Sequence, residues 1–234
     1  MSLIVQQLSK SYGNQLAVDQ VSFHLKQGQV VGFLGPNGAG KSTTLKMMAG
    51  YLSPDSGTIQ LNGLSIDQDA LEAKKIIGYL PESNALYEHL YVKEYLQFLI
   101  SVHRIEKGNQ RIKEVIEQTR LGLMQHKKIG DLSKGYKQRL GIAAAIIHQP
   151  KLILLDEPTT GLDPNQLIEI RALIQSLSSA SIILFSTHIL QEVTAICDRV
   201  LVLHQGKLVA DEPIGDLLQK HNTSLEEIFK LLTH

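Results

Sequence analysis

Several features that would mark particular classes of protein are scarce or missing in this 234-residue chain. A single cysteine, Cys197, excludes an intramolecular disulfide and favours a reducing compartment; we expect it to behave as a small buried apolar residue. The longest apolar runs, such as Ile142–Ile147 and Ile182–Phe185, are far shorter than the roughly 20 residues that span a bilayer. The N-terminal residues also lack the apolar stretch of a signal peptide. We therefore expect a soluble protein, for which any membrane role needs a second chain.

Net charge is the other missing feature. The 23 basic and 23 acidic residues cancel, which gives no electrostatic reason to expect nucleic acid or an anionic membrane as a broad partner. Internal repeats and long charge runs are absent as well. With 43% hydrophobic and 20% charged residues, the composition suits one large α/β domain or a core with a subdomain.

The N-terminal part of the sequence predicts short strands. Apolar stretches indicate strands at Ile4–Leu8, Val21–Leu25 and Val30–Leu34. A further strand, Thr58–Leu61, follows a turn-rich cluster and ends in Asn62-Gly63, which is a strong hairpin signal. This part therefore mixes antiparallel strands with the strand Val30–Leu34.

The middle of the chain, from about Tyr91 to His148, has a helical pattern. Apolar residues recur at helical spacing in Tyr91–Val102, and Ile105–Leu121 is amphipathic. Ser133 is a suitable N-cap for a third helix that runs to His148. This part is a candidate helical subdomain.

The C-terminal part predicts a parallel sheet. Two continuous apolar runs, Leu152–Leu155 and Ile182–Phe185, are separated by the amphipathic segment Asn165–Leu177. Continuous rather than alternating apolar strands joined by helices indicate a parallel sheet covered on both faces. A hairpin of Arg199–Leu203 with Lys207–Val209 follows, and the residues 224–227 form a capping box that opens a last helix through residue 232.

A phosphate-binding loop is the strongest signal in the sequence. The segment Gly35–Ser42 fits G-x-x-x-x-G-K-S/T, follows the strand Val30–Leu34 and precedes a helical run to about Gly50. Glycines let the backbone curl so that several N–H groups face one anion at the positive end of a helix. Lys41 adds a cation toward the β and γ phosphates, and the Ser42 hydroxyl can ligate Mg²⁺. A glycine-rich turn that binds nothing is the weaker alternative.

Two further strand ends carry polar groups. The strand Leu152–Leu155 is followed by Asp156-Glu157, and the carboxyl ends of strands form the ligand crevice of an open α/β sheet. There Asp156 can hold Mg²⁺ through water, and Glu157 can polarise the attacking water. The strand Ile182–Phe185 ends in the same way near His188, which could hydrogen-bond the γ-phosphate or the water; its position alone leaves this open.

Taken together, these residues resemble the ATP-binding subunit of ABC transporters over nearly the whole chain. Six motifs occur in the order of the family. Tyr12 in SYG looks like the aromatic residue that stacks on adenine, Gly35–Ser42 looks like the Walker A loop, and LSKGYKQR at 132–139 is similar to the signature. Further on, Leu152–Glu157 resembles Walker B with its catalytic glutamate, Gly161-Leu162-Asp163 looks like the D-loop, and His188 looks like the switch histidine. Within the family the chain looks like the exporter branch that includes gliding-motility, drug and polysaccharide systems. The nucleotide-binding set is then Tyr12, Val18, Gly35, Pro36, Asn37, Gly38, Ala39, Gly40, Lys41, Ser42, Thr43, Ser133, Gly135 and Asp163.

The resemblance implies an architecture and partners. It implies a RecA-like P-loop NTPase core with an antiparallel β subdomain, approximately residues 1–82 and 150–234, and a helical subdomain at 83–149. Two subunits would close head to tail over two ATP molecules, so that Ser133 meets the γ-phosphate bound by the other subunit. The second partner would be a separate integral membrane permease, which places the chain at the cytoplasmic face of the inner membrane. ATP and Mg²⁺ are the implied ligands.

The sequence departs from the family pattern at two places. In the signature, Lys134 replaces a glycine and Tyr136 a glutamine, whereas Ser133 and Gly135 are kept, so hydrolysis is still expected. In IGYLPES, Glu82 stands where the family usually has glutamine, in a loop that touches Mg²⁺ or the attacking water and also faces the membrane subunit.

Glu82 brings a negative charge toward the triphosphate. At about 6 Å and an effective dielectric constant of about 20, one charge pair is worth roughly 3 kcal/mol. Mg²⁺ would reverse the sign, because carboxylate is a good ligand for a hard cation. Our hypothesis is that Glu82 is a catalytic and metal-binding residue that approaches only when Mg²⁺–ATP is bound. The alternative is an ordinary solvated carboxylate.

Two other functions are weighed against a transport ATPase. A non-transport ABC ATPase that acts on nucleic acid or ribosomes would carry long coiled-coil or zinc-bearing insertions, or two cassettes in one chain, and none of these is present. A GTP-binding switch would need an Asn-Lys-x-Asp motif, which is also absent.

Overall fold

The computed structural model describes residues 1–233, and a six-stranded sheet forms its centre. The strands, in spatial order, are β10 (Lys207–Pro213), β9 (Arg199–His204), β3 (Val30–Leu34), β8 (Ile182–Thr187), β7 (Leu152–Asp156) and β6 (Ile77–Leu80). All of them run parallel except β10, which pairs antiparallel with β9 as a hairpin. The predicted α/β class with a parallel sheet is confirmed.

The continuous apolar pattern of β7 and β8 has a direct cause in the packing. Leu152 and Leu154 lie in one hydrophobic cluster, whereas Ile153 and Leu155 lie in another on the opposite face. The same alternation holds along β8. Because both faces of the sheet are covered, every position of these strands is apolar until the polar residues at their carboxyl ends.

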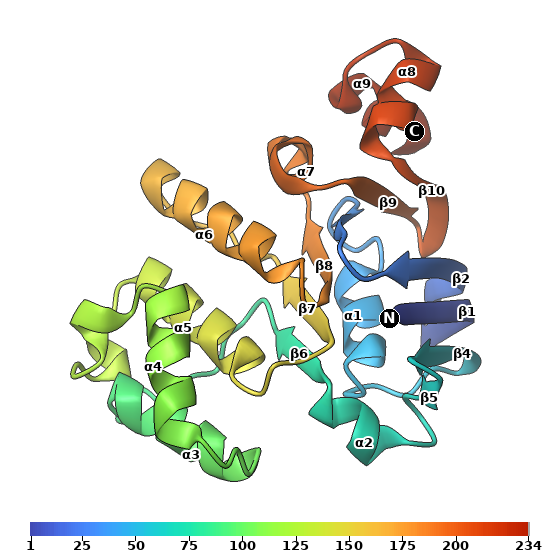
Figure 1. Cartoon of the computed structure of the whole chain (residues 1–234). Helices are drawn as coiled ribbons and strands as arrows, with labels where there is room; N and C mark the ends of the chain where they lie inside the picture. Colours follow the sequence, from blue (N-terminus) through green and yellow to red (C-terminus); the bar gives the residue numbers. More distant parts are fainter. Residues whose placement is uncertain (234) are drawn as a thin grey trace.

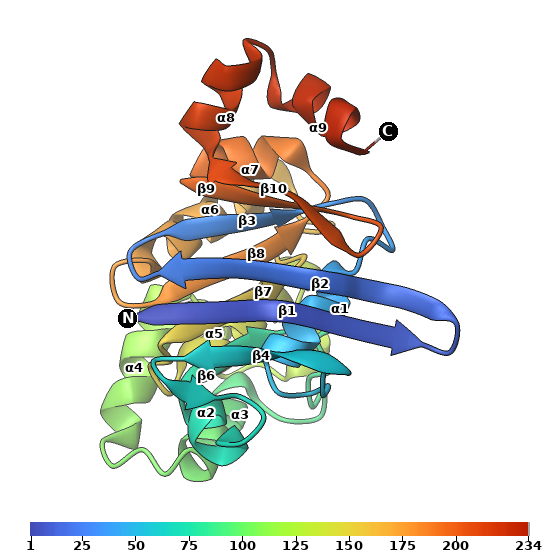
Figure 2. The same ribbon diagram turned by 90° about the vertical axis from the view of Figure 1, so that its right-hand side faces the viewer.

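A second sheet is antiparallel and has four strands. Its order is β2 (Gln15–Lys26), β1 (Ser2–Tyr12), β4 (Ser56–Leu61) and β5 (Leu64–Ser65). The first helix, α1 (Lys41–Met48), lies between this sheet and the parallel one, as Figure 1 shows, and Figure 2 shows the long strands β1 and β2 crossing in front. The predicted hairpin turn is confirmed, because Asn62 and Gly63 both have positive φ, 52° and 83°.

Helices gather on the other face of the parallel sheet. Three of them, α3 (Val92–Val102), α4 (Gly108–Gln118) and α5 (Lys134–Ile146), lie together at the lower left of Figure 1 and fall within residues 83–149. Short 3-10 turns at Gly122–Met124 and Ile129–Asp131 connect α4 to α5. A longer helix, α6 (Pro164–Leu177), packs beside β7 and β8 (Figure 1).

The C-terminal helices form a third packed group. The helices α7 (Leu190–Ile196), α8 (Ile214–His221) and α9 (Leu225–Thr233) bury apolar residues against β9 and the end of β3. One of the two hydrogen bonds of the predicted capping box is present, in which the Glu227 N–H donates to Ser224 Oγ at 3.4 Å. No helix of the described residues is long and apolar enough to cross a membrane.

Some elements differ from the sequence-based expectation. The helices α2 (Ala70–Lys75), α7 and α8 were not predicted, because six to eight residues are too few to show a clear helical period. The strands β1 and β2 are longer than predicted, since register shifts interrupt the alternation of buried residues along them.

Candidate active site

The phosphate loop lies between the buried strand β3 and helix α1. Gly38 and Gly40 have φ angles of 79° and 105°, which glycine adopts without strain. A Cβ at Gly40 would overlap the main-chain oxygen of Ala17, and one at Gly35 that of Leu203. The glycines are therefore needed both for the curl of the loop and for its close packing.

Lys41 is the first residue of α1 and is buried, with 7% exposure. Its Nζ donates to the main-chain oxygens of Gly35 at 2.7 Å and Pro36 at 3.2 Å. Burial lowers the pKa of Lys41, while the carboxylates of Glu157, Asp156 and Glu82 oppose that fall. The lysine is thus held across the loop by neutral carbonyls, next to the position where the loop would hold an anion.

Asp156 forms an oxygen-rich cluster at the carboxyl end of β7. It is 1% exposed, and its Oδ1 accepts from Ser42 Oγ at 3.1 Å and from Ser186 Oγ at 2.5 Å. Mg²⁺ prefers oxygen ligands, and the Ser42 hydroxyl and the Asp156 carboxylate lie side by side. The residues present therefore fit Mg²⁺. Ser186 was not singled out from the sequence, since its contact with Asp156 depends on the pairing of β7 with β8.

Glu157 follows directly and has a left-handed backbone, with φ at 50°. This conformation is uncommon outside glycine, and the Glu157 N–H donates to Ser186 Oγ at 3.1 Å. Both oxygens of its carboxylate are engaged: Thr160 Oγ1 donates to Oε2 at 3.0 Å, and His188 Nδ1 lies 2.9 Å from Oε1. The two strand ends thus bring Glu157 and His188 together; a direct contact between them was not predicted from the sequence.

A cavity of about 430 Å³ opens in front of these groups. It is lined by Tyr12, Gln15, Ala17, Asn37, Gly38, Gly40, Lys41, Ser42, Thr43, Glu82, Glu157, Thr160 and His188. Tyr12 lines the cavity with a half-exposed side chain, at 52%. Glu82 is exposed and faces the same space. Gln15, Ala17 and Thr160 were not predicted.

Val18 is the predicted nucleotide-binding residue whose placement needs correction. It is fully buried in the core, and its neighbour Ala17 lines the cavity instead. The reason is a register shift: Lys10 pairs with Val18 but the next residue, Ser11, pairs with Leu16, so Ala17 is the extra residue of a bulge. The bulge changes which side chain points at the cavity.

The comparisons with known proteins agree with this geometry. The family model described as ABC transporter matches residues 18–160, which is more than half of the chain. The chain belongs to the ABC transporter family. Its ATP-binding cassette binds and hydrolyses ATP, which confirms the predicted family and enzyme class.

Relatives and solved structures support the same membership. An uncharacterised ABC transporter ATP-binding protein of Bacillus subtilis, YxlF, is 40% identical over 95% of this chain and 75% of its own length. The bacitracin transport ATP-binding protein BcrA of Bacillus licheniformis is 40% identical over 97% of this chain and 75% of its own. A solved ATP-binding subunit of an ABC transporter covers all of both chains with a TM-score of 0.91 at 30% identity. The bacterial ABC transporter cassette MJ0796, solved as a dimer, matches with a TM-score of 0.81 at 27% identity, over 91% of this chain and 98% of its own.

The remaining predicted site residues of this ABC cassette lie away from the cavity. Ser133 is exposed and caps α5, where its Oγ accepts from the Tyr136 N–H, and Asp163 caps α6. A Cβ at Gly135 would overlap the side chain of Gln166, so the starts of α5 and α6 are packed together. These residues do not line the nucleotide cavity of their own subunit, and their nucleotide-binding role stays a prediction that requires a second subunit. The loop residues Gly35, Pro36 and Ala39 shape the phosphate loop but do not line the cavity.

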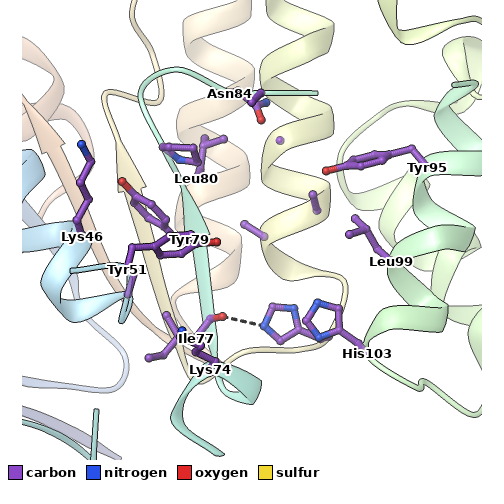
Figure 3. A pocket seen from close by; sticks show the side chains of 17 residues that line it. Lys46, Tyr51, Lys74, Ile77, Tyr79, Leu80, Asn84, Tyr95, Leu99 and His103 are labelled. Atoms are coloured by element: carbon purple, nitrogen blue, oxygen red, sulfur yellow. Dashed lines mark hydrogen bonds between the residues drawn. The ribbon is translucent and has the colours of Figure 1, made fainter. Parts of the chain in front are cut away.

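A second, larger cavity of about 700 Å³ has β6 and the end of α1 on one side and helices α3 and α5 on the other (Figure 3). Its floor is made of small residues of α5, and its walls carry Tyr51, Tyr79 and Tyr95. Tyr51 is 75% exposed, and the Tyr79 ring lies beside it in a tilted orientation, with 5.5 Å between the ring centroids and an interplanar angle of 52°. At its edge His148 and His103 stack in parallel, 4.2 Å apart, and His148 Nε2 lies 2.9 Å from the Ile77 oxygen.

Proposed function

We propose that this chain is the ATP-hydrolysing subunit of an exporter whose membrane-spanning permease is a separate chain. The observation that carries the proposal is that the end of β6 and the residues directly after it border both cavities. Leu80 and Pro81 line the larger cavity, and Glu82, the next residue, lines the nucleotide cavity. A group bound in one cavity therefore touches the same short segment as a group bound in the other.

The nucleotide cavity supports a division of labour among its residues. Tyr12 would stack on adenine, the loop N–H groups and Lys41 would hold the phosphates, and Ser42 with Asp156 would hold Mg²⁺. Mg²⁺ would supply charge neutralisation to the triphosphate. Glu157 would polarise the attacking water, and His188, which is next to it, would contact the water or the γ-phosphate.

Dimer formation would complete the site. Ser133 at the N-terminus of α5 offers a hydroxyl and free N–H groups, which suit an anion. In a head-to-tail dimer it would meet the γ-phosphate bound by the partner, with Gly135 and Asp163 close by. The cassette MJ0796, which was solved as a dimer, supports the formation of a dimer.

The larger cavity supports a permease partner. It combines apolar walls, a floor of small residues and an exposed tyrosine, which suit the insertion of an apolar segment of another protein. Export is supported by the names of relatives, which include a bacitracin transport protein and a linearmycin resistance protein. The chain would then work at the cytoplasmic face of the inner membrane.

Site-specific photo-crosslinking tests the permease partner. A photo-reactive residue at Ala85, which is exposed and lines the larger cavity, should crosslink to an integral membrane protein. The same residue at Gln60, exposed on the far sheet, is the matched control and should not. Equal yields at both positions, or a crosslinked ribosomal protein or nucleic acid, would contradict the proposal.

A further inference from the structure

Glu192 is a carboxyl side chain buried behind the strand end that carries His188. It lies in the first turn of α7 and is 1% exposed. Its Oε2 accepts from Thr187 Oγ1 at 2.8 Å, whereas its Oε1 is buried and has no hydrogen-bond partner among residues 1–233. A buried carboxyl group with one unpaired oxygen destabilises a fold, so packing alone does not explain its presence.

The hydrogen bonds around Glu192 close a small ring. The Ile189 N–H donates to Thr187 Oγ1 at 3.0 Å, and the Thr187 hydroxyl in turn donates to Glu192. The Glu192 N–H then donates back to the Ile189 oxygen at 3.1 Å. His188, Leu190 and Gln191 lie within this segment and make none of the bonds of the ring. The ring therefore fixes the backbone on both sides of the histidine and leaves its side chain free.

The ring is anchored to the strand that leads into the phosphate loop. Thr187 pairs with Leu34, the last residue of β3. The helix α7 packs closely on β3, because a Cβ at Gly32 would come within 3.2 Å of Val193 and 3.0 Å of Cys197 Sγ. The carboxyl group of Glu192 is thus held at a fixed place relative to the phosphate loop.

On the other side of the ring, His188 meets the candidate catalytic carboxylate. Its Nδ1 lies 2.9 Å from Glu157 Oε1, and its side chain is 44% exposed toward the cavity. The contact with Glu157 is the one hydrogen bond that the His188 imidazole makes among residues 1–233. The orientation of the side chain therefore depends on this contact and on its backbone, which is the part that the ring of hydrogen bonds fixes.

We propose that Glu192 is a positioning residue for the hydrolysis of ATP. It acts through Thr187, which sets the turn that directs His188 toward Glu157 and the γ-phosphate end of the cavity. This inference depends on the role proposed above for His188. Because misplacement by about 1 Å can cost up to about 100-fold in rate, the contribution of Glu192 is expected in kcat rather than in ATP binding.

Two matched pairs of variants test the inference. Glu192→Gln keeps an oxygen that accepts from Thr187, whereas Glu192→Leu has a similar volume and no acceptor. We expect Glu192→Leu to lower kcat about tenfold or more, with KM for ATP within about twofold of the wild type, and Glu192→Gln to restore most of the rate. Thr187→Ser and Thr187→Val form the second pair, in which only Val loses the hydroxyl, and this pair carries the test if Glu192→Leu does not fold.

A double-mutant cycle separates positioning from a structural role. If Glu192 acts through His188, Glu192→Leu should cause no further loss of kcat in a His188→Ala background. The inference would be overturned if the kcat losses of the two single variants multiplied in the double variant, or if Glu192→Leu and Thr187→Val kept full kcat. Either result would leave the role of His188 intact. Full kcat in His188→Ala alone would instead overturn the proposed role of His188, and with it the inference.

Discussion

His188 Nδ1 lies 2.9 Å from Glu157 Oε1, and this contact joins the ends of two neighbouring parallel strands. The other oxygen of Glu157 accepts from Thr160, and the backbone of Glu157 is held in a left-handed conformation by Ser186. A carboxylate with both oxygens engaged and an uncommon backbone has a well-defined direction. It points into the cavity that the phosphate loop borders, where an attacking water would lie.

Replacing Glu157 by glutamine should separate ATP binding from ATP hydrolysis. Glutamine keeps the size of the side chain and the contact with Thr160 but cannot accept a proton from water. We expect kcat to fall by roughly 10²–10⁴-fold, the usual loss for a general base, while ATP affinity is retained and an ATP-bound dimer accumulates. Single-turnover hydrolysis and size-exclusion chromatography with ATP measure the two effects. A turnover near that of the wild type would show that another group is the base.

Replacing Glu82 by glutamine should change the Mg²⁺ dependence. The carboxylate of Glu82 faces the cavity and acts on Lys41, so it adds negative charge near the triphosphate and is also a potential ligand of a hard cation. If it approaches bound Mg²⁺, Glu82→Gln should need several-fold more Mg²⁺ for half-maximal ATPase activity and for half-maximal binding of a fluorescent ATP analogue.

The control for this prediction is Glu88→Gln. Glu88 is an exposed carboxylate six residues further on, bonded to Lys137 at 2.7 Å, and it does not line the nucleotide cavity. Its substitution should leave the Mg²⁺ dependence unchanged. The same dependence in Glu82→Gln as in the wild type would show that Glu82 is an ordinary solvated carboxylate.

The sequence predicts the parts of the site that are local in the chain and misses those that depend on neighbouring strands. The phosphate loop and Asp156-Glu157 are recognisable because each is a short contiguous motif after an apolar strand. The contact of Ser186 with Asp156 exists only because β7 and β8 pair in one register. Likewise, the bulge at Ala17 could not be read from the sequence, and it decides that Ala17 rather than Val18 faces the cavity.

Acid should destabilise the protein through His148. Burial, reinforced by the neighbouring His103, lowers the pKa of His148 from 6.5 to about 4. The unfolded chain then binds a proton that the folded protein excludes, so stability is intact above pH 6.5 and falls as the pH drops toward 4. Between pH 7 and pH 5 the loss from this residue is about 2 kcal/mol.

Urea denaturation at the two pH values measures this effect. His148→Gln removes the titrating group, so its free energy of unfolding should change less between pH 7 and pH 5 than that of the wild type. His126→Gln, at an exposed histidine, is the matched control and should behave as the wild type does. An equal pH dependence in all three proteins would mean that His148 is not the group responsible.

Ser133→Asp should abolish ATP-driven dimerisation without weakening the monomer. Aspartate is as good an N-cap as serine, so the cap that Ser133 gives to the Tyr136 N–H is kept and the melting temperature should stay close to that of the wild type. Ser133 is exposed and does not line the cavity of its own subunit, so ATP binding to the monomer should also be unchanged. The added negative charge would however meet the γ-phosphate of the partner subunit, where like charges repel.

Sedimentation of Glu157→Gln with and without Ser133→Asp, in the presence of ATP, measures the dimer. Ser133→Thr is the control that keeps a neutral hydroxyl. If Ser133→Asp dimerises as well as Ser133→Thr does, Ser133 does not face the nucleotide of the partner.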